Sequence, residues 1–222
     1  MMRATDVPFV FKGCVELRQA LDLHALDERE LLDGVRAAPP DSIFFHTYGY
    51  FLRHRPFTTA FGNDFARWAA VELRDQVLAE RLAVVDPFSF PTLDELREDL
   101  VTIVQDHVRG TDAVLRLPFA RGFHFQQSHL VEVPLGPSAR TLREFRDGLA
   151  RVDASAIYLH MVDARARRGP GAGDFTEWVR ASLGMEALAE KFERIDAYLQ
   201  TLERVRGRLL NLVDAALEEG DE

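Results

Sequence analysis

FVFKGCVELRQALDLHALDERELLDGVRA, residues 9–37, has a second version in the same chain, FHFQQSHLVEVPLGPSARTLREFRDGLAR, at residues 123–151. At an offset of 114, 11 of the 45 residue pairs between 9–53 and 123–167 are identical. Unrelated sequences of average composition agree at roughly one position in sixteen. The offset falls to 110 and then to 109 further along, with matches as far as Val104 and Val213. The chain therefore contains a tandem duplication.

Each copy begins with a predicted strand, followed by a predicted helix. Apolar residues alternate in the strands, which is typical of a strand with one buried face; they are Phe9, Phe11, Val15 and Leu17 in the first copy and Phe123, Phe125, Val131, Val133 and Leu135 in the second. The helices are expected over DERELLDGVRAA and TLREFRDGLARV, because each begins with a residue that favours a helix N-terminus.

Three further helices are predicted in each copy. DSIFFHTYGYFLRHR and DASAIYLHMVDARARR contain no proline and end in arginines, which favours a helix; a strand through IFFH is the alternative. A long helix is expected from NDF or GDF, and a last amphipathic helix from Thr92 or near Gln200.

The expected fold class is α+β, predominantly helical, with a strand and about four helices in each copy. The predicted divisions are a first repeat at 1–110, a linker at 111–122, a second repeat at 123–217 and an acidic tail at 218–222 that we expect to be disordered. One strand per copy leaves backbone groups unpaired. We therefore expect the copies to pair about a pseudo-two-fold axis as one intertwined domain.

The composition excludes several classes of protein. A net charge of −9 over 222 residues makes general binding to nucleic acid or to an anionic membrane unfavourable. Cys14 is the one cysteine, so no internal disulfide can form. No stretch approaches the roughly 18 apolar residues of a membrane span, and the N-terminus does not resemble a secretory signal. We expect a soluble, cytoplasmic protein.

The polar residues that both copies keep are the candidate site. His46 and His160 are each followed seven residues later by an arginine, Arg53 and Arg167, on the same stripe of a helix. If the stripes meet, two histidines and two arginines form a pocket for a phosphate or carboxylate. The alternative is a buried histidine with a satisfied partner and an arginine favoured at a helix C-terminus.

Two further conserved pairs, Asp64 with Trp68 and Asp174 with Trp178, open the next helix of each copy. As a site, the aspartate orients the histidine, and a polar ligand stacks on the indole. As structure, the aspartate is a helix N-cap and the tryptophan a core residue.

A metal centre built from His46, His160 and the two aspartates is a further hypothesis. Their types suit zinc, iron or manganese. The chain has no His-x3-His, His-Glu-x-x-His or Glu-x-x-His spacing, no phosphate loop and no Gly-x-Ser-x-Gly turn. The sequence therefore predicts no metal ligands and no catalytic residues, and it identifies no cofactor.

The strings FKGCVEL, SIFFHTYGYFLRHR and NDFARWAA, with FHFQQS, SAIYLHMVDARARR and DFTEWV in the second copy, resemble a prokaryotic family that is known only as a domain of unknown function. The resemblance covers nearly the whole chain and implies no activity. The second copy has Met161 where the first has Thr47, and Gly173 where the first has Asn63. We therefore expect the first copy to be the working half of any site.

Two functions follow from these observations. The first is a non-enzymatic binding or adaptor module that recognises a partner protein or a small anionic ligand, either as a monomer or as a homodimer. The second is an enzyme, with or without a metal, that uses His46 as acid, base or ligand, aided by Asp64 and Arg53, on a substrate bearing phosphate or carboxylate.

Overall fold

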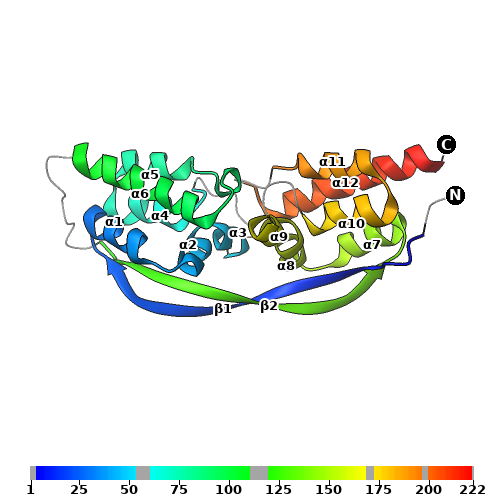
Figure 1. Ribbon diagram of the computed structural model, residues 1–222, viewed down its shortest axis with the longest axis horizontal. Helices are drawn as coiled ribbons and strands as arrows, with labels where there is room; N and C mark the ends of the chain where they lie inside the picture. The colour runs from blue at the N-terminus through cyan, green and yellow to red at the C-terminus, as the bar shows by residue number, and fades with distance from the viewer. Residues whose placement is uncertain (1–3, 54–60, 111–119, 169–172, 197–199, 222) are drawn as a thin grey trace. The chain divides into compact units, whose positions relative to one another are not determined.

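The computed structural model describes residues 4–53, 61–110, 120–168, 173–196 and 200–221 and shows an α+β, predominantly helical protein (Figure 1). Two strands, β1 (Phe9–Ala25) and β2 (Phe123–Ala139), form a two-stranded sheet. Lys12 contacts Glu132, whereas Gln19, later in β1, contacts Gln127, earlier in β2. The strands are therefore antiparallel.

The helices after each strand follow a similar order. Those after β1 are α1 (Glu28–Ala37), α2 (Pro40–His46), α3 (Tyr48–Arg53), α4 (Asp64–Trp68), the π-helical η1 (Ala69–Leu73), α5 (Gln76–Ala83), the 3-10 turn η2 (Pro87–Ser89) and α6 (Leu93–Gly110). Those after β2 are α7 (Leu142–Arg151), α8 (Ala154–Ile157), the π-helical η3 (Tyr158–Asp163), α9 (Ala164–Arg168), α10 (Asp174–Leu183), α11 (Glu186–Glu193) and α12 (Leu202–Asp221).

Local sequence explains where several of these helices begin. The side chain of Asp27 accepts hydrogen bonds from two backbone N–H groups at the start of α1, and Thr141 and Glu144 form a reciprocal capping box at the start of α7. The segment that includes IFFH is helical in α2, so the alternative of a strand is wrong.

Two other expectations about the helices need correction. The long helix predicted from NDF or GDF is broken into two, because Arg74 and Gly184 adopt left-handed backbone conformations (φ 56° and 69°) that end η1 and α10. The acidic tail at 218–222 was expected to be disordered, but α12 continues through it as far as Asp221. Of the predicted linker at 111–122, residues 111–119 lie outside the described residues.

The chain divides into two compact units that do not coincide with the two repeats predicted from the sequence. Unit 1 contains the described residues of Met1–Val15 and Leu130–Glu222, and unit 2 those of Glu16–Arg53 and Thr59–His129. Each unit therefore combines the helices of one repeat with the first part of the strand from the other repeat.

The core of unit 2 forms around the beginning of β2. Phe125 is fully buried, and Phe123 stacks on Phe65 of α4 with 5.1 Å between ring centroids. A Cβ on Gly34 of α1 would lie 2.4 Å from the Phe125 ring. The glycine therefore lets the helix approach the aromatic ring closely.

Unit 1 packs in the same way around the beginning of β1. Phe11 is fully buried and stacks on Phe145 of α7, with 5.5 Å between ring centroids. A Cβ on Gly148 would lie 2.3 Å from the Phe11 ring. Residues 9–15 of the first repeat are thus part of the core built from the helices of the second.

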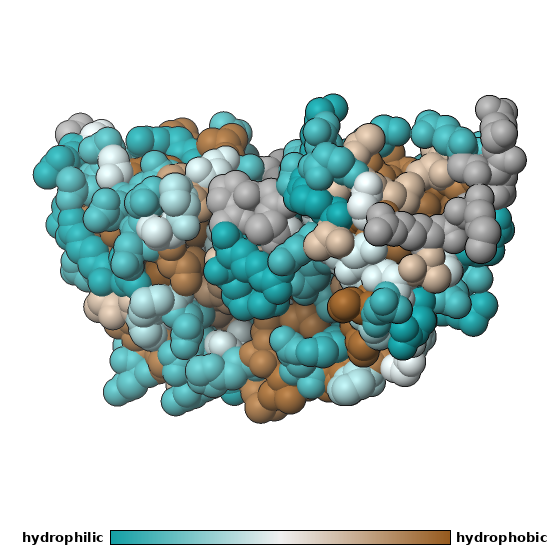
Figure 2. All heavy atoms as spheres, turned by 45° about the vertical axis from the view of Figure 1, so that its right-hand side comes forward, coloured by the Kyte–Doolittle hydropathy of each residue, from teal (hydrophilic) through white to brown (hydrophobic). Residues whose placement is uncertain are grey.

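Several side chains of both strands are exposed on the surface. Figure 2 shows hydrophobic side chains among the hydrophilic ones on the lower side of the molecule, where Figure 1 draws the strands. The large apolar residues exposed on the strands are Val10, Val15, Leu17, Val131 and Val133. Among the described residues, no helix is long and apolar enough to cross a membrane.

Candidate functional site

In unit 2, His46 joins the end of α2 to α4 and to β2. Its Nδ1 lies 2.9 Å from Oδ2 of Asp64, and its Nε2 accepts a hydrogen bond of 3.0 Å from the backbone N–H of Gln126. Because Nε2 accepts, Nδ1 carries the proton and donates to the carboxylate of Asp64. The imidazole is therefore neutral.

The burial of His46 supports this protonation state. The residue is 3% exposed, and burial lowers the pKa of its imidazole, although the hydrogen bond and the charge of Asp64 act in the opposite direction. Arg53 adds a positive charge that also lowers this pKa.

His160 has the same two kinds of partner in unit 1. Its Nδ1 lies 2.8 Å from Oδ2 of Asp174, and its Nε2 accepts a hydrogen bond of 3.1 Å from the backbone N–H of Lys12. Burial acts to raise the pKa of Asp174, but the hydrogen bond to His160 and the charges of Arg168 and Arg167 lower it overall. The carboxylate is thus held ionised.

In both units the histidine satisfies a backbone donor of the strand next to the helices. Lys12 and Gln126 direct their N–H groups away from the other strand, to a side where the described residues form no further strand. An unpaired donor of a buried strand edge is unfavourable. The pairs His46–Asp64 and His160–Asp174 therefore attach helices to strands. Of the two roles that the sequence left open for the aspartates, contact with the histidine is the one observed.

The arginines differ between the units. Arg53 pairs with Oδ2 of Asp64 and with Oε1 of Glu16 at 3.4 Å, and its guanidinium carbon lies 3.8 Å from the centroid of the Phe45 ring. Its side chain is 9% exposed. Glu16 is not among the residues predicted from the sequence. Its equivalent position is Leu130, so the two copies do not share a polar residue there.

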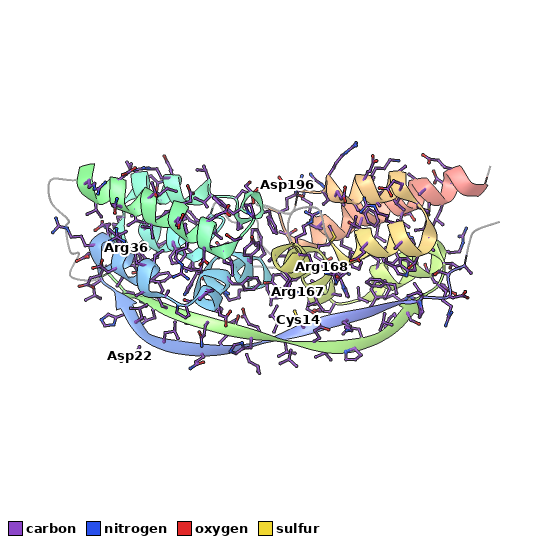
Figure 3. The ribbon with its side chains drawn as sticks, viewed as in Figure 1. Cys14, Asp22, Arg36, Arg167, Arg168 and Asp196 are labelled. Carbon is purple, nitrogen blue, oxygen red and sulfur yellow. The ribbon has the colours of Figure 1, made fainter. Side chains whose placement is uncertain are left out.

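In unit 1 it is Arg168 that pairs with Asp174, at 2.8 Å, while Arg167 pairs with Asp163 of η3 at 2.5 Å. Figure 3 labels both arginines at the end of α9. A π turn holds about one residue more than an α turn. The π-helical η3 therefore shifts the following arginines by about one position, which the seven-residue spacing could not reveal.

The two tryptophans and two aspartates occupy equivalent places. Trp68 donates from Nε1 to the carbonyl of Arg121 at 2.7 Å, and Trp178 donates to the carbonyl of Val7 at 2.9 Å. Both indoles are largely buried. Asp64 and Asp174 are the first residues of α4 and α10 and not their N-caps, which are Asn63 and Gly173.

Each unit has a pocket beside its histidine. The pocket of unit 2 has a volume of about 510 Å³ and is lined by four arginines but only two carboxylates: Arg18, Arg53, Arg67 and Arg121 against Asp64 and Glu72. The pocket of unit 1, of about 430 Å³, balances its charges, with Lys12, Arg167 and Arg168 against Glu132, Asp174 and Glu177. All eight candidate residues of the sequence analysis line one pocket or the other.

The excess charge of the unit 2 pocket is located at Arg67 and Arg121. Both residues are exposed, and within the described part of the chain no ion pair involves either guanidinium. The carboxylate of Glu72 accepts a hydrogen bond of 2.8 Å from the backbone N–H of Arg121. The sequence prediction that both histidines share one pocket stays a prediction. No group of three or more His, Cys, Asp or Glu suited to a metal ion occurs among the described residues.

Residues 6–214 match the Family of unknown function (DUF5752). The chain belongs to this family. Among solved structures, it is similar to one described as "The structure of OrfY from Thermoproteus tenax", with 27% sequence identity and a TM-score of 0.78 over 96% of this chain and 97% of that chain. No curated protein matches it. What this family member does must follow from the chemistry of its pockets.

Proposed function

We propose that the protein is a non-enzymatic binding module whose unit 2 pocket holds a small anion with phosphate or carboxylate groups. The observation that carries this proposal is the pair of unneutralised arginines, Arg67 and Arg121, at a pocket of about 510 Å³. Guanidinium groups bind both anions through charged, paired hydrogen bonds. Arg53 forms ion pairs with Asp64 and Glu16, so its side chain is a rigid part of the pocket lining.

The comparison of the two units supports unit 2 as the binding half. Arg67 corresponds to Glu177 in the aligned sequence of the second repeat, and Glu177 lines the unit 1 pocket. The second repeat therefore has a negative charge where the first has a positive one. We infer that the units derive from one duplicated ancestor and that only the first kept, or acquired, the anion site.

The hydrogen bonds of His46 favour binding over acid–base catalysis. Asp64 and the backbone N–H of Gln126 occupy both of its ring nitrogens, so a proton transfer to a substrate requires breaking one of these bonds. A general base has to reach the proton that it removes. The enzyme hypothesis that uses His46 has no comparable support.

Isothermal titration calorimetry with inorganic phosphate, a sugar phosphate and citrate tests the proposal. We expect saturable binding of at least one of these anions by the natural protein, weakened at high salt because charge attraction dominates it. Arg67→Glu, which introduces the residue of the second repeat, and Arg121→Gln should each reduce affinity roughly tenfold or more.

Arg194→Gln is the matched control, because Arg194 is exposed on the surface and does not line the pocket. It removes one positive charge and should leave affinity unchanged. The proposal is wrong if the natural protein binds none of the anions, or if the control weakens binding as much as the pocket variants do.

A further inference from the structure

The part of β1 in unit 2, residues 16–25, has one edge that no other strand covers within the part of the chain that the structure describes. The N–H of Lys12 points away from β2, and backbone direction alternates along a strand. The even-numbered residues from Glu16 to His24 therefore direct their N–H and C=O groups toward this free edge. In Figure 1 this part of β1 is the outermost ribbon on the side away from helices α1 to α6.

The sequence of this edge is complementary to itself. If a second copy pairs antiparallel to it with Ala20 opposite Ala20, each Arg18 lies opposite Asp22 of the other copy. The same register places Leu17 opposite Leu23 on the other face. Opposite charges and apolar pairs across strands stabilise antiparallel pairing. The register also places outward-directed backbone groups opposite each other, as a ladder requires.

The side chains at this edge are available for such pairing. Leu17 is 56% exposed, and Asp22 is exposed on the outer side of β1 (Figure 3). The side chain of Arg18 pairs with Glu16 of the same strand at 2.7 Å but is still 53% exposed, so it can also contact Asp22 of a second copy. An exposed edge without a blocking residue is a ready template for another strand.

The corresponding edge of β2 in unit 1 is blocked. Ala20 aligns with Pro134, an even-numbered residue of β2 that, like Gln126, directs its backbone away from β1. Leu23 aligns with Pro137, at a position that faces β1. Proline lacks the N–H that a ladder needs and is a common means of protecting edge strands. Gly136 lies between them with φ 90°. One strand thus carries a proline at an edge-facing position, whereas residues 16–25 of its counterpart in the other unit contain none.

From these observations we propose that the protein is a homodimer in which residues 16–24 of β1 pair antiparallel with the same residues of a second copy, centred on Ala20. The two sheets then join into one four-stranded sheet. Arg18 and Asp22 set the register, and the exposed Leu17 becomes covered by Leu23 of the other copy. Arg18 also lines the unit 2 pocket, but the inference rests on the backbone edge of β1 and does not require that an anion binds.

Sedimentation velocity of the full chain at several concentrations tests the proposal. The natural protein should sediment as a dimer of 25.2 kDa subunits. Ala20→Pro should be monomeric while keeping its circular dichroism spectrum, because Ala20 directs its N–H outward and Pro134 already occupies the equivalent position. Asp22→Arg should raise the dissociation constant roughly tenfold or more by placing like charges opposite each other.

Ser138→Arg is the matched control, because Ser138 is an exposed residue of β2 outside the proposed pairing. It should leave the dimer intact. The proposal fails if the natural protein is monomeric, or if folded Ala20→Pro remains dimeric. If Ala20→Pro does not fold, the Asp22→Arg variant provides the test. A dimer dissociation constant equal to that of the natural protein would then overturn the proposed register and edge.

Discussion

Replacing Gly34 or Gly148 by alanine tests the packing of the exchanged strand parts directly. A Cβ at Gly34 would lie 2.4 Å from two ring carbons of Phe125, and a Cβ at Gly148 would lie 2.3 Å from the ring of Phe11. Both rings are fully buried and cannot turn away without displacing neighbours. The added methyl group must therefore force helix and strand apart.

The expected magnitude is the difference between two opposing effects. Alanine is favoured over glycine in a helix by about 1 kcal/mol, whereas overpacking a core costs about 1–3 kcal/mol. Because the contacts are so short, we expect the net free energy of unfolding to fall by about 1–2 kcal/mol in each variant. A Cβ on Gly207 of α12 would meet no atom within 4 Å among the described residues, apart from its chain neighbours and the backbone of its own helix turn. Gly207→Ala should therefore gain about 1 kcal/mol.

Thermal unfolding by calorimetry can separate these outcomes. For a chain of this size, 1 kcal/mol shifts Tm by about 2–4 °C. Gly34→Ala and Gly148→Ala should melt below the natural protein, and Gly207→Ala above it. If all three substitutions raise Tm alike, Phe11 and Phe125 do not pack against these helices, and the assignment of the strand parts to the two units is wrong.

Three other predictions concern residues of the site and of the helix ends. In ¹⁵N NMR spectra at pH 7, His46 should be neutral with the proton on Nδ1; an Nε2–H form would contradict the hydrogen bond that Nε2 accepts from the backbone N–H of Gln126. The lowered pKa of His46 means that the unfolded chain binds more protons below the ordinary value of 6.5, so the free energy of unfolding should be highest above pH 6.5 and fall as the pH drops below it; urea unfolding that is flat from pH 8 to 5 would argue against this. Arg74→Gly should stabilise the protein by about 0.5–1 kcal/mol and Gly184→Arg destabilise it by about 1–2 kcal/mol, because both positions have positive φ; chemical denaturation measures both, and equal effects of one sign would refute the argument.

Much of the fold could be predicted from periodicity and capping residues. The alternating apolar residues of Phe9–Ala25 and the Asp27 cap correctly indicated a strand followed by a helix. The break at Arg74 could not be predicted, because arginine carries no signal for a left-handed conformation. Gly184 at the equivalent place did carry one, and the repeat alignment could have transferred it.

Sequence reasoning named some of the residues that line the pockets, but neither their contacts nor Arg67 and Arg121, on which the proposed function rests. The sequence identified His46, Asp64 and Trp68 because the second copy kept the same types of residue. It could not show that backbone N–H groups of the strands occupy Nε2 of the histidines, since every residue except proline has such a donor. Nor could it predict Glu16, a carboxylate that is 6% exposed and holds Arg53, because that contact joins residues 37 positions apart.

Because the strands are divided between the units, unit 2 cannot complete its core until the beginning of β2 has been synthesised. Helices α1 to α6 end at Gly110, but the core of unit 2 also requires Phe123 and Phe125. At ordinary translation rates, the ribosome needs roughly one to four seconds to add the residues from 111 to 129. During that interval the nascent helices have an unfilled apolar core. A fragment that ends at residue 110 stays in this incomplete state, open to chaperones and to aggregation.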